Sequence, residues 1–404
     1  MAKYLNIVVS GEVDAGKSTL IGRFLYDMDF LAQGAMEEVN DSCRKLDRNF
    51  EFAYLLDSFE EERENQLTID TTQIICKSRK GNNFVFIDVP GHRELIKNML
   101  SGSSYADIAI LVVDASKSIE EQTKRHAFIL KFLGIERIIP VLNKMDLVGY
   151  GREKYEQLTK ELGDFLQGKD IKSRHFIPVS AKDGENLIRK SRKMHWYKGL
   201  SLLEALNSGF VKKSDSDTRF IIQDIYSRNG KKTAIGRIIS GNIKKADMVR
   251  VLPINKEMRV KKIVVFNKNK FSAFAPESIG LELDEMASLA RGQVLSKGRP
   301  PELRSEIPAR IFCVRKLDTS LPLKFKCAAQ ESPARISQVF EVRDSLELES
   351  KIIRDCLEEN DVAKVVISTE RPLVVEKYKF AGSLGRFVLM YDSDIYAIGI
   401  ISQY

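Results

Sequence analysis

The 404-residue sequence contains few cysteines and few histidines. Its five cysteines are scattered, odd in number and form no CxxC pair, which argues against a disulfide framework and a structural zinc site. The four histidines show no spacing typical of metal ligands. No apolar run approaches the roughly 18 residues that a membrane-spanning helix needs. These absences favour a reducing compartment, so we expect a cytoplasmic location and no membrane partner.

The composition is that of an ordinary globular protein, with 43% hydrophobic and 30% charged residues. At about 150 residues per domain, the length predicts two or three domains. The net charge of +8 permits contact with nucleic acid, although solvated lysine-rich faces are the simpler explanation. The densest basic cluster, residues 189–193, precedes Trp196 and Tyr197. This pattern indicates either a nucleic-acid contact or, more commonly, a loop whose aromatic side chains pack on the domain.

Short β-branched segments alternate with helical patterns over roughly the first 206 residues. The predicted strands are residues 4–9, 84–88, 108–114, 137–143 and 176–178, and the predicted helices are residues 17–27, 93–101, 119–133 and 154–167. Such alternation predicts a mostly parallel sheet covered on both faces. Beyond a polar linker, short strands and turns predict closed barrels. We therefore expect an α/β domain at residues 1–212 and two all-β barrels at residues 213–302 and 303–404.

Residues 11–18, GEVDAGKS, match the phosphate-binding pattern GxxxxGK[ST] completely. The motif lies between a predicted strand and a predicted helix, where backbone N–H groups and the helix N-terminus can face phosphates. Lys17 is predicted to reach the β- and γ-phosphates, and the Ser18 hydroxyl to bind Mg²⁺. The other predicted phosphate contacts of this loop are Val13, Asp14, Ala15, Gly16 and Thr19.

Two motifs that follow later strands predict recognition of guanine. In NKMD, residues 143–146, the Asp146 carboxylate can accept the guanine N1–H and 2-amino groups, which adenine lacks. In SAK, residues 180–182, the Ala181 N–H can contact the guanine O6. The complete set of predicted guanine-binding residues is Asn143, Lys144, Asp146, Ser180, Ala181 and Lys182. With the phosphate-binding loop, these motifs predict GTP or GDP as the ligand.

The segment DVPGH, residues 88–92, supplies candidates for hydrolysis. Asp88 ends a predicted strand and can hold Mg²⁺ through water, while the Gly91 N–H can sense the γ-phosphate. His92 can orient the attacking water, the role that glutamine has in other GTPases. The sequence therefore predicts a GTPase with His92 as its catalytic residue.

A second Mg²⁺-binding hydroxyl is expected in a switch segment ahead of the Asp88 strand. Thr68 is the best candidate, and its neighbours Thr71 and Thr72 are alternatives. Such a segment becomes ordered when the γ-phosphate and Mg²⁺ hold it, and it loosens after hydrolysis.

The motifs GEVDAGKST, DVPGHRELIKNM and NKMDL resemble those of elongation factor Tu and its relatives. The resemblance implies a GTPase domain followed by two β-barrels, as the pattern of strands also predicts. In that family a valine of the phosphate-binding loop and the residue before the switch threonine form an apolar gate beside the catalytic histidine. By position, the resemblance implies that Val13 and Leu67 form this gate.

Within this family, nearly the whole chain is similar to the GTPase subunit of bacterial two-subunit ATP sulfurylase (sulfate adenylyltransferase). The similar segments are residues 22–27, 124–126, 143–150, 196–199, 263–266, 273–276, 284–292, 333–336, 371–374 and 385–389. This resemblance implies a heterodimer in which GTP hydrolysis is coupled to synthesis of adenylyl sulfate by a smaller catalytic subunit. The alternative is an elongation factor-like GTPase that delivers aminoacyl-tRNA to the ribosome. Glu12 departs from both groups, since translation factors usually carry histidine there and the sulfurylase subunit a small polar residue.

Overall fold

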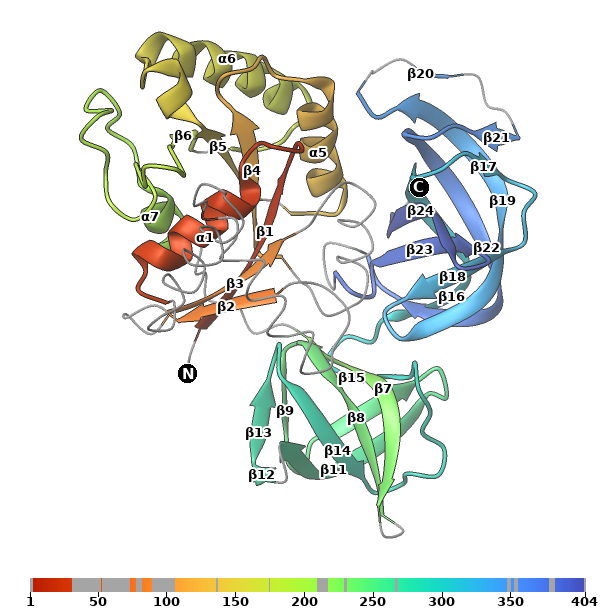
Figure 1. Ribbon diagram of the computed structural model, residues 1–404. Coiled ribbons are helices and arrows are strands. Elements are labelled where there is room, and N and C mark those ends of the chain that lie inside the picture. Colours follow the sequence, from red (N-terminus) through yellow and green to blue (C-terminus); the bar gives the residue numbers. More distant parts are fainter. Residues whose placement is uncertain are drawn as a thin grey trace, which may run out of the picture. The chain divides into compact units, whose positions relative to one another are not determined.

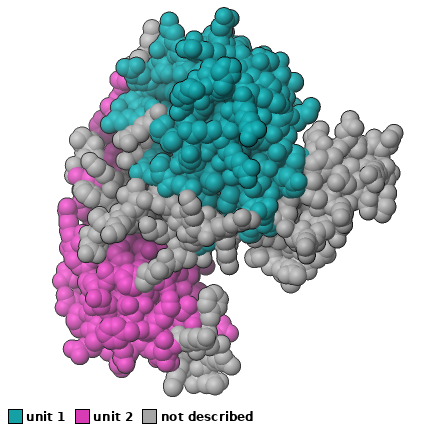
Figure 2. Space-filling model, turned by 90° about the vertical axis from the view of Figure 1, so that its left-hand side faces the viewer, with its two compact units in different colours: residues 1–99, 103–211 teal, residues 100–102, 212–404 magenta. Residues whose placement is uncertain are grey.

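The chain divides into two units, which Figure 2 shows in different colours. Unit 1 holds residues 1–99 and 103–211, and unit 2 holds residues 100–102 and 212–404. The computed structural model describes residues 3–30, 52, 73–77, 82–88, 106–135, 137–173, 175–208, 217–228, 231–265, 268–346, 350–351, 355–377 and 382–402. Within these residues, every helix is too short or too polar to cross a membrane.

Unit 1 is built on a six-stranded sheet with the order β2-β3-β1-β4-β5-β6. Its strands are β1 (Lys3–Gly11), β2 (Gln73–Lys77), β3 (Asn82–Asp88), β4 (Ile108–Asp114), β5 (Ile138–Asn143) and β6 (Ile177–Pro178). Only β2, at the edge, pairs antiparallel with its neighbour, whereas the other pairs of this sheet are parallel. Every residue of β4 and β5 is buried, as expected for central strands of a sheet covered on both faces.

The described helices of unit 1 follow β1, β4, β5 and β6 along the chain (Figure 1). They are α1 (Lys17–Asp27), α5 (Glu121–Phe132), α6 (Arg152–Gly168), α7 (Leu202–Asn207) and the short 3-10 helix η1 (Met145–Val148). Phe24 of α1 packs edge-on against Phe84 and Phe86 of β3, with ring centroids 6.1 and 5.2 Å apart. The prediction of a mostly parallel α/β domain is confirmed, while the predicted helix at residues 93–101 lies outside the described residues.

The first part of unit 2 is a closed barrel. Its strands are β7 (Thr218–Arg228), β8 (Lys231–Ser240), β9 (Asn242–Lys244), β10 (Met248–Leu252), β11 (Lys256–Val265), β12 (Lys268–Lys270), β13 (Ser272–Phe274), β14 (Ser278–Leu283) and β15 (Val294–Lys297). The ring runs β10-β15-β7-β8-β14-β11, and the pairing of β10 with β11 closes it. Closure removes the exposed edges that an open sheet would present.

The second part of unit 2 is a barrel of similar design. Its strands are β16 (Glu302–Cys313), β17 (Leu317–Asp318), β18 (Leu323–Cys327), β19 (Gln330–Asp344), β20 (Ser350–Lys351), β21 (Cys356–Leu357), β22 (Asp361–Val375), β23 (Arg386–Tyr391) and β24 (Asp394–Ile401). The ring β18-β23-β24-β16-β22-β19 closes through pairing of β18 with β19. In its core Phe325 and Phe387 stack at 4.4 Å, and a Cβ at Gly399 would lie 2.0 Å from the Phe387 ring. The prediction of all-β modules after the α/β domain is confirmed.

A buried ion pair joins the two barrels of unit 2. Arg219 of β7 is 1% exposed and donates through Nε and Nη2 to the Glu376 carboxylate at 3.1 and 2.6 Å. Its Nη1 also donates to the Thr218 carbonyl at 2.9 Å. An apolar cluster from both barrels includes Ile221, Leu252, Val294, Val374 and Leu384. The boundaries at residues 212/213 and 302/303 stay a prediction.

Candidate functional site

The predicted ligand-binding motifs follow strands that end at one edge of the unit 1 sheet. Because β1, β3, β4, β5 and β6 run parallel, their carboxyl ends meet at the same edge. The strand β1 lies between β3 and β4. The connection after β1 therefore leads to strands on one side of β1, and the connection after β3 leads to β4 on its other side. Ligands of open α/β sheets bind in this position, outside the carboxyl ends of the strands.

The phosphate-binding loop connects β1 to α1. Gly16 is the N-cap of α1 with φ 86°, and a Cβ there would lie 2.5 Å from Asn143 Nδ2, so both backbone and space require glycine. Lys17 Nζ donates to the carbonyls of Gly11 and Glu12 at 3.0 and 2.6 Å. A helix that begins with a glycine N-cap presents its first-turn N–H groups to an anion without competition from a capping side chain. The loop therefore has the geometry of a phosphate cradle.

Glu12 ties the phosphate-binding loop to helix α5. It is 8% exposed, and its Oε1 accepts the Thr123 N–H at 3.1 Å and also the Thr123 hydroxyl. Thr123 lies in the first turn of α5, where a carboxylate also interacts favourably with the helix dipole. Two positions earlier, in β1, Ser10 Oγ lies 2.8 Å from His126 Nδ1 of the same helix. Sequence reasoning recorded Glu12 only as a departure and missed this contact.

Asn143 connects the phosphate side of the site to the guanine side. It is 2% exposed at the end of β5, and its Nδ2 donates to the Ala15 carbonyl at 2.9 Å. Its Oδ1 accepts the Ala181 N–H at 3.0 Å. Nearby, the Ser180 hydroxyl donates to Asp146 Oδ1 at 2.7 Å. The structure thus brings together the three motifs that the sequence assigned to one nucleotide.

Lys144 takes a left-handed backbone conformation with φ 63° and turns its ammonium group toward β4. Its Nζ lies 2.7 Å from Asp114 Oδ2, and the Ser116 hydroxyl donates to Asp114 Oδ1 at 2.6 Å. Burial alone would raise the pKa of Asp114, but the hydrogen bonds from Lys144 and Ser116 lower it below its ordinary value. Asp114 is therefore a charged anchor for the NKMD segment.

The expected Mg²⁺ donors are partly described. Ser18 lies in the first turn of α1, and Asp88 ends β3 opposite Val9 of the neighbouring β1. A hydroxyl and a carboxylate are oxygen donors of the kind that Mg²⁺ prefers, so the residue types suit such an ion, and their role as its ligands stays a prediction.

The remaining switch and gate residues are only partly described. Thr68, Leu67, Gly91 and His92 lie outside the described residues, so their roles stay predictions. Val13, the other gate residue, is 72% exposed in the phosphate-binding loop.

The loop that contains the basic cluster packs its aromatic side chains on unit 1. The rings of Trp196 and Tyr197 lie 5.1 and 5.9 Å from the ring of Tyr155 in α6. The Trp196 indole N–H donates to the Tyr150 carbonyl at 3.0 Å. The expectation of an aromatic loop packed on the domain is confirmed, and these rings are engaged with protein rather than offered to nucleic-acid bases.

A phosphate-binding loop after the first strand of such a parallel sheet defines the class of P-loop nucleotide-binding domains, and the family comparison places this one among the GTPases. The family model "Elongation factor Tu GTP binding domain" matches residues 2–212, and the model "GTP-eEF1A C-terminal domain-like" matches residues 309–402. The chain belongs to the elongation factor Tu-like family of translational GTPases.

Curated relatives of this chain include members of two functional groups. Elongation factor 1-alpha of Staphylothermus marinus is 35% identical over 421 residues, which cover 98% of this chain and 96% of the relative. Sulfate adenylyltransferase subunit 1 of Bacteroides thetaiotaomicron is 31% identical over 416 residues, which cover 98% of this chain and 86% of the relative. Among solved structures, the GTP-bound GTPase-like domain of S. cerevisiae Ski7 has a similar fold. Its TM-score is 0.60 at 18% identity, with 99% of this chain and 97% of that chain covered.

Proposed function

We propose that the protein binds GTP and GDP in unit 1 and hydrolyses GTP. The observation that carries the proposal is the hydrogen bond from Ser180 to Asp146, which orients the carboxylate predicted to accept the two guanine donors. Asn143 braces the same loop against the phosphate cradle. Such a site discriminates strongly against adenine nucleotides, because adenine lacks the two donors and would leave the Asp146 carboxylate without hydrogen-bond partners.

The phosphates would lie along the N-terminus of α1, where Lys17 would exchange its loop carbonyls for the β- and γ-phosphate oxygens. The side chains that would hold Mg²⁺ are Ser18, Thr68 and Asp88. When bound, this ion neutralises charge that develops between the β- and γ-phosphates.

Hydrolysis would depend on the residues that follow β3. We propose that His92 orients the attacking water and that the Gly91 N–H responds to the γ-phosphate. Val13 and Leu67 would form the apolar gate beside His92. The loss of the γ-phosphate would then release the switch segment and change the conformation presented to a partner.

We further propose that this switch serves as the GTPase subunit of a sulfate adenylyltransferase, and that a smaller catalytic subunit forms adenylyl sulfate from ATP and sulfate. Sequence identity of 31–32% to subunit 1 of two Bacteroides species, over 98% of the chain, supports this role. The packing of Trp196 and Tyr197 on Tyr155 also weakens the argument for a nucleic-acid partner that the basic cluster offered.

The second candidate is an elongation factor-like GTPase that delivers aminoacyl-tRNA to the ribosome. It is favoured by 35% identity to an elongation factor 1-alpha and by the C-terminal match to the eEF1A-type domain.

Reconstitution with the adenylyltransferase-type subunit of the source organism distinguishes the two candidates. The measurement is pyrophosphate release that requires both ATP and sulfate. We expect GTP to increase this rate, and the Asp146→Asn variant to transfer the stimulation from GTP to xanthosine triphosphate. GTP-dependent, salt-sensitive binding of aminoacyl-tRNA, without any effect on pyrophosphate release, would support the elongation-factor role instead.

A further inference from the structure

The guanine loop, residues 180–184, is held from two sides by residues that no motif includes. Lys193 holds it from the basic cluster, and Arg23 holds it from α1. We propose that Lys193 and Arg23 are positioning residues for guanine recognition, acting through Asp183 and Lys182. This inference rests on the proposed guanine site and adds residues that set its base selectivity.

On one side, Asp183 is the centre of a polar network. Its Oδ2 accepts from Lys193 Nζ at 2.7 Å and also from the Tyr150 hydroxyl. Lys193 Nζ in turn donates to the Tyr150 hydroxyl at 3.0 Å and lies 4.8 Å from the centre of the Tyr150 ring. Tyr150 follows the NKMD motif, and its carbonyl is held by Trp196. The network therefore joins three segments: the turn after NKMD, the guanine loop and the basic cluster.

This network is continuous with the residue predicted to read the base. The Asp183 N–H donates to Ser180 Oγ at 3.2 Å, and the Ser180 hydroxyl donates to Asp146 Oδ1 at 2.7 Å. The position of Asp183 thus determines the position of the hydroxyl that orients Asp146. Fixing a recognition group through supporting hydrogen bonds is a general requirement for selectivity.

The charges of the pair persist over the neutral pH range. Hydrogen bonds from Lys193 and then Tyr150 lower the pKa of Asp183, and hydrogen bonds to Asp183 and Tyr150 raise the pKa of Lys193. The contact with Lys193 is therefore a charge-assisted hydrogen bond, which is stronger than a neutral one.

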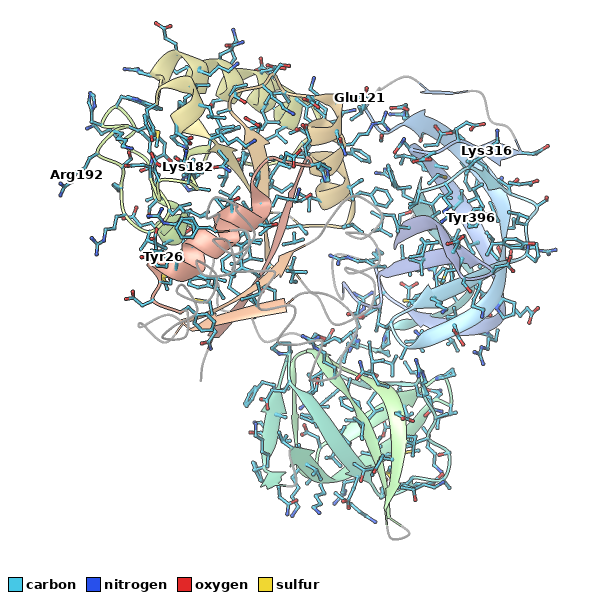
Figure 3. The ribbon with its side chains drawn as sticks, viewed as in Figure 1. Tyr26, Glu121, Lys182, Arg192, Lys316 and Tyr396 are labelled. Atoms are coloured by element: carbon cyan, nitrogen blue, oxygen red, sulfur yellow. The ribbon has the colours of Figure 1, made fainter. Side chains whose placement is uncertain are left out.

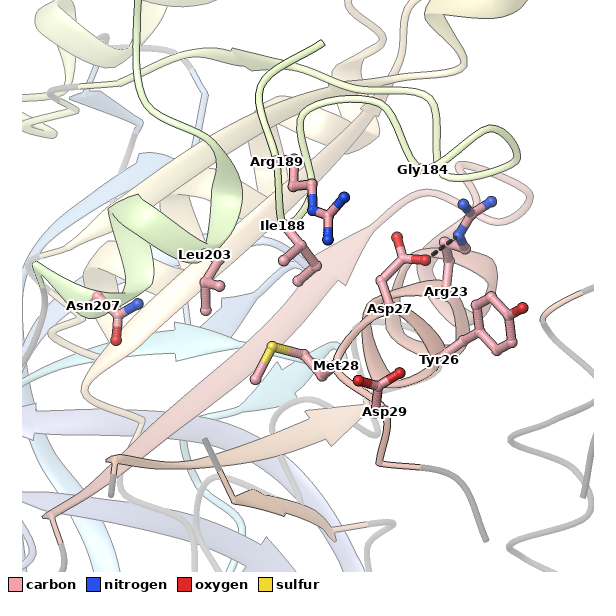
Figure 4. Close-up of a pocket in the computed structure, with 10 residues that line it drawn as sticks. All are labelled: Arg23, Tyr26, Asp27, Met28, Asp29, Gly184, Ile188, Arg189, Leu203 and Asn207. Atoms are coloured by element: carbon pink, nitrogen blue, oxygen red, sulfur yellow. Dashed lines mark hydrogen bonds and ion pairs between the residues drawn. The ribbon is translucent and has the colours of Figure 1, made fainter. Parts of the chain in front are cut away.

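On the other side, Arg23 reaches from α1 to the guanine loop. Its Nη1 donates to the Lys182 carbonyl at 2.8 Å, while Nε pairs with Asp27 at 2.9 Å and fixes the guanidinium (Figure 4). A Cβ at Gly184 would lie 2.3 Å from the guanidinium, so glycine at this position leaves the room that Arg23 occupies. The loop is thereby braced at two consecutive residues, Lys182 and Asp183.

The test measures the affinities of the full-length protein for GDP and for IDP, which lacks the 2-amino group that Asp146 would accept. We expect Lys193→Met to reduce the GDP-to-IDP affinity ratio about fivefold, the size of one exposed charge pair. Lys193→Arg should restore the ratio, because its guanidinium can still donate to Asp183. Arg23→Met should also reduce it. The matched control is Arg192→Met, which removes the same charge from an exposed neighbour on the same loop (Figure 3).

The outcomes separate this inference from the proposed function. A purely structural role of Lys193 would lower both affinities equally and leave the ratio unchanged, and that result would overturn the inference. An equal effect of Arg192→Met would overturn it as well, since the effect would then come from net charge. If the wild-type protein binds GDP and IDP with the same affinity, the guanine site and the inference both fail.

Discussion

Removal of the Glu376 carboxylate should destabilise unit 2 by several kcal/mol. The carboxylate accepts two hydrogen bonds from Arg219, which is 1% exposed and would keep its charge without its main partner. Breaking a buried ion pair on one side typically costs about 3–5 kcal/mol. We therefore expect Glu376→Ala to lower the free energy of unfolding of unit 2 by this amount. Glu376→Gln retains a hydrogen-bond acceptor and should lower it by roughly 2 kcal/mol. The double variant Arg219→Met/Glu376→Leu should recover most of the loss, because it removes both charges and fills the space.

The single tryptophan of the chain makes the assay selective. Trp196 belongs to unit 1, so its fluorescence reports urea unfolding of that unit alone, while far-ultraviolet circular dichroism reports the secondary structure of both units. Separate probes are needed because a chain of several domains need not unfold in one transition. We expect Glu376→Ala to shift to lower urea the part of the circular-dichroism transition that the tryptophan signal does not follow, and to leave the tryptophan midpoint unchanged. An unchanged barrel transition, or an equal shift of the tryptophan transition, would refute the reasoning.

Three further predictions concern unit 1. Glu12→Ala should lower the stability of unit 1 by about 1–3 kcal/mol and accelerate GDP release. Thr123→Val keeps the N–H donor and should have a smaller effect. Equal GDP release rates in the wild type and both variants would contradict the anchoring of the loop. His92→Ala should retain GDP affinity in titrations but slow GTP hydrolysis by about 10²–10⁴-fold, and wild-type turnover would remove its catalytic role. The third prediction concerns Asp114, whose pKa is lower in the folded than in the unfolded protein. Its pairing with Lys144 therefore stabilises unit 1 fully above the unfolded pKa of about 3.9. This stabilisation is lost as the pH falls through the lower pKa of the folded state. Asp114→Asn should therefore weaken the acid dependence of unit 1 unfolding, and an unaltered dependence below about pH 4 would count against the ion pair.

Elements with a strong local pattern could be predicted from the sequence. The predicted helix 17–27 coincides with α1, and the predicted strand 108–114 coincides with β4. The predicted helix 119–133 contains α5 (Glu121–Phe132). By contrast, the edge strand β2 (Gln73–Lys77) was missed. Its five residues are too few for a clear alternation, and it is defined by antiparallel pairing with β3.

The motifs of the site could be predicted, but the contacts that support them could not. Glycine at position 16 and the NKMD and SAK motifs have spacings that follow from phosphate and guanine chemistry. The contact of Glu12 with Thr123 joins residues 111 positions apart, and that of Arg23 with Lys182 joins residues 159 positions apart. Such pairs depend on how α1, α5 and the guanine loop pack, and no local pattern encodes them. The departure at Glu12 is visible in the sequence, but only the structure shows that its carboxylate is buried and therefore needs a partner.

Nucleotide selectivity of the Asp146→Asn variant tests the central claim most directly. Two charge-assisted hydrogen bonds to guanine, at about 1.5–3 kcal/mol each, correspond to a loss of about 10²–10⁴-fold in GTP affinity. The variant amide can instead donate to the 2-oxo group of xanthine, so affinity for xanthosine triphosphate should rise. The measurement is a parallel titration of wild type and variant with both nucleotides. Exchange of the preference from GTP to xanthosine triphosphate is the predicted result, and unchanged GTP affinity in the variant would contradict the guanine site.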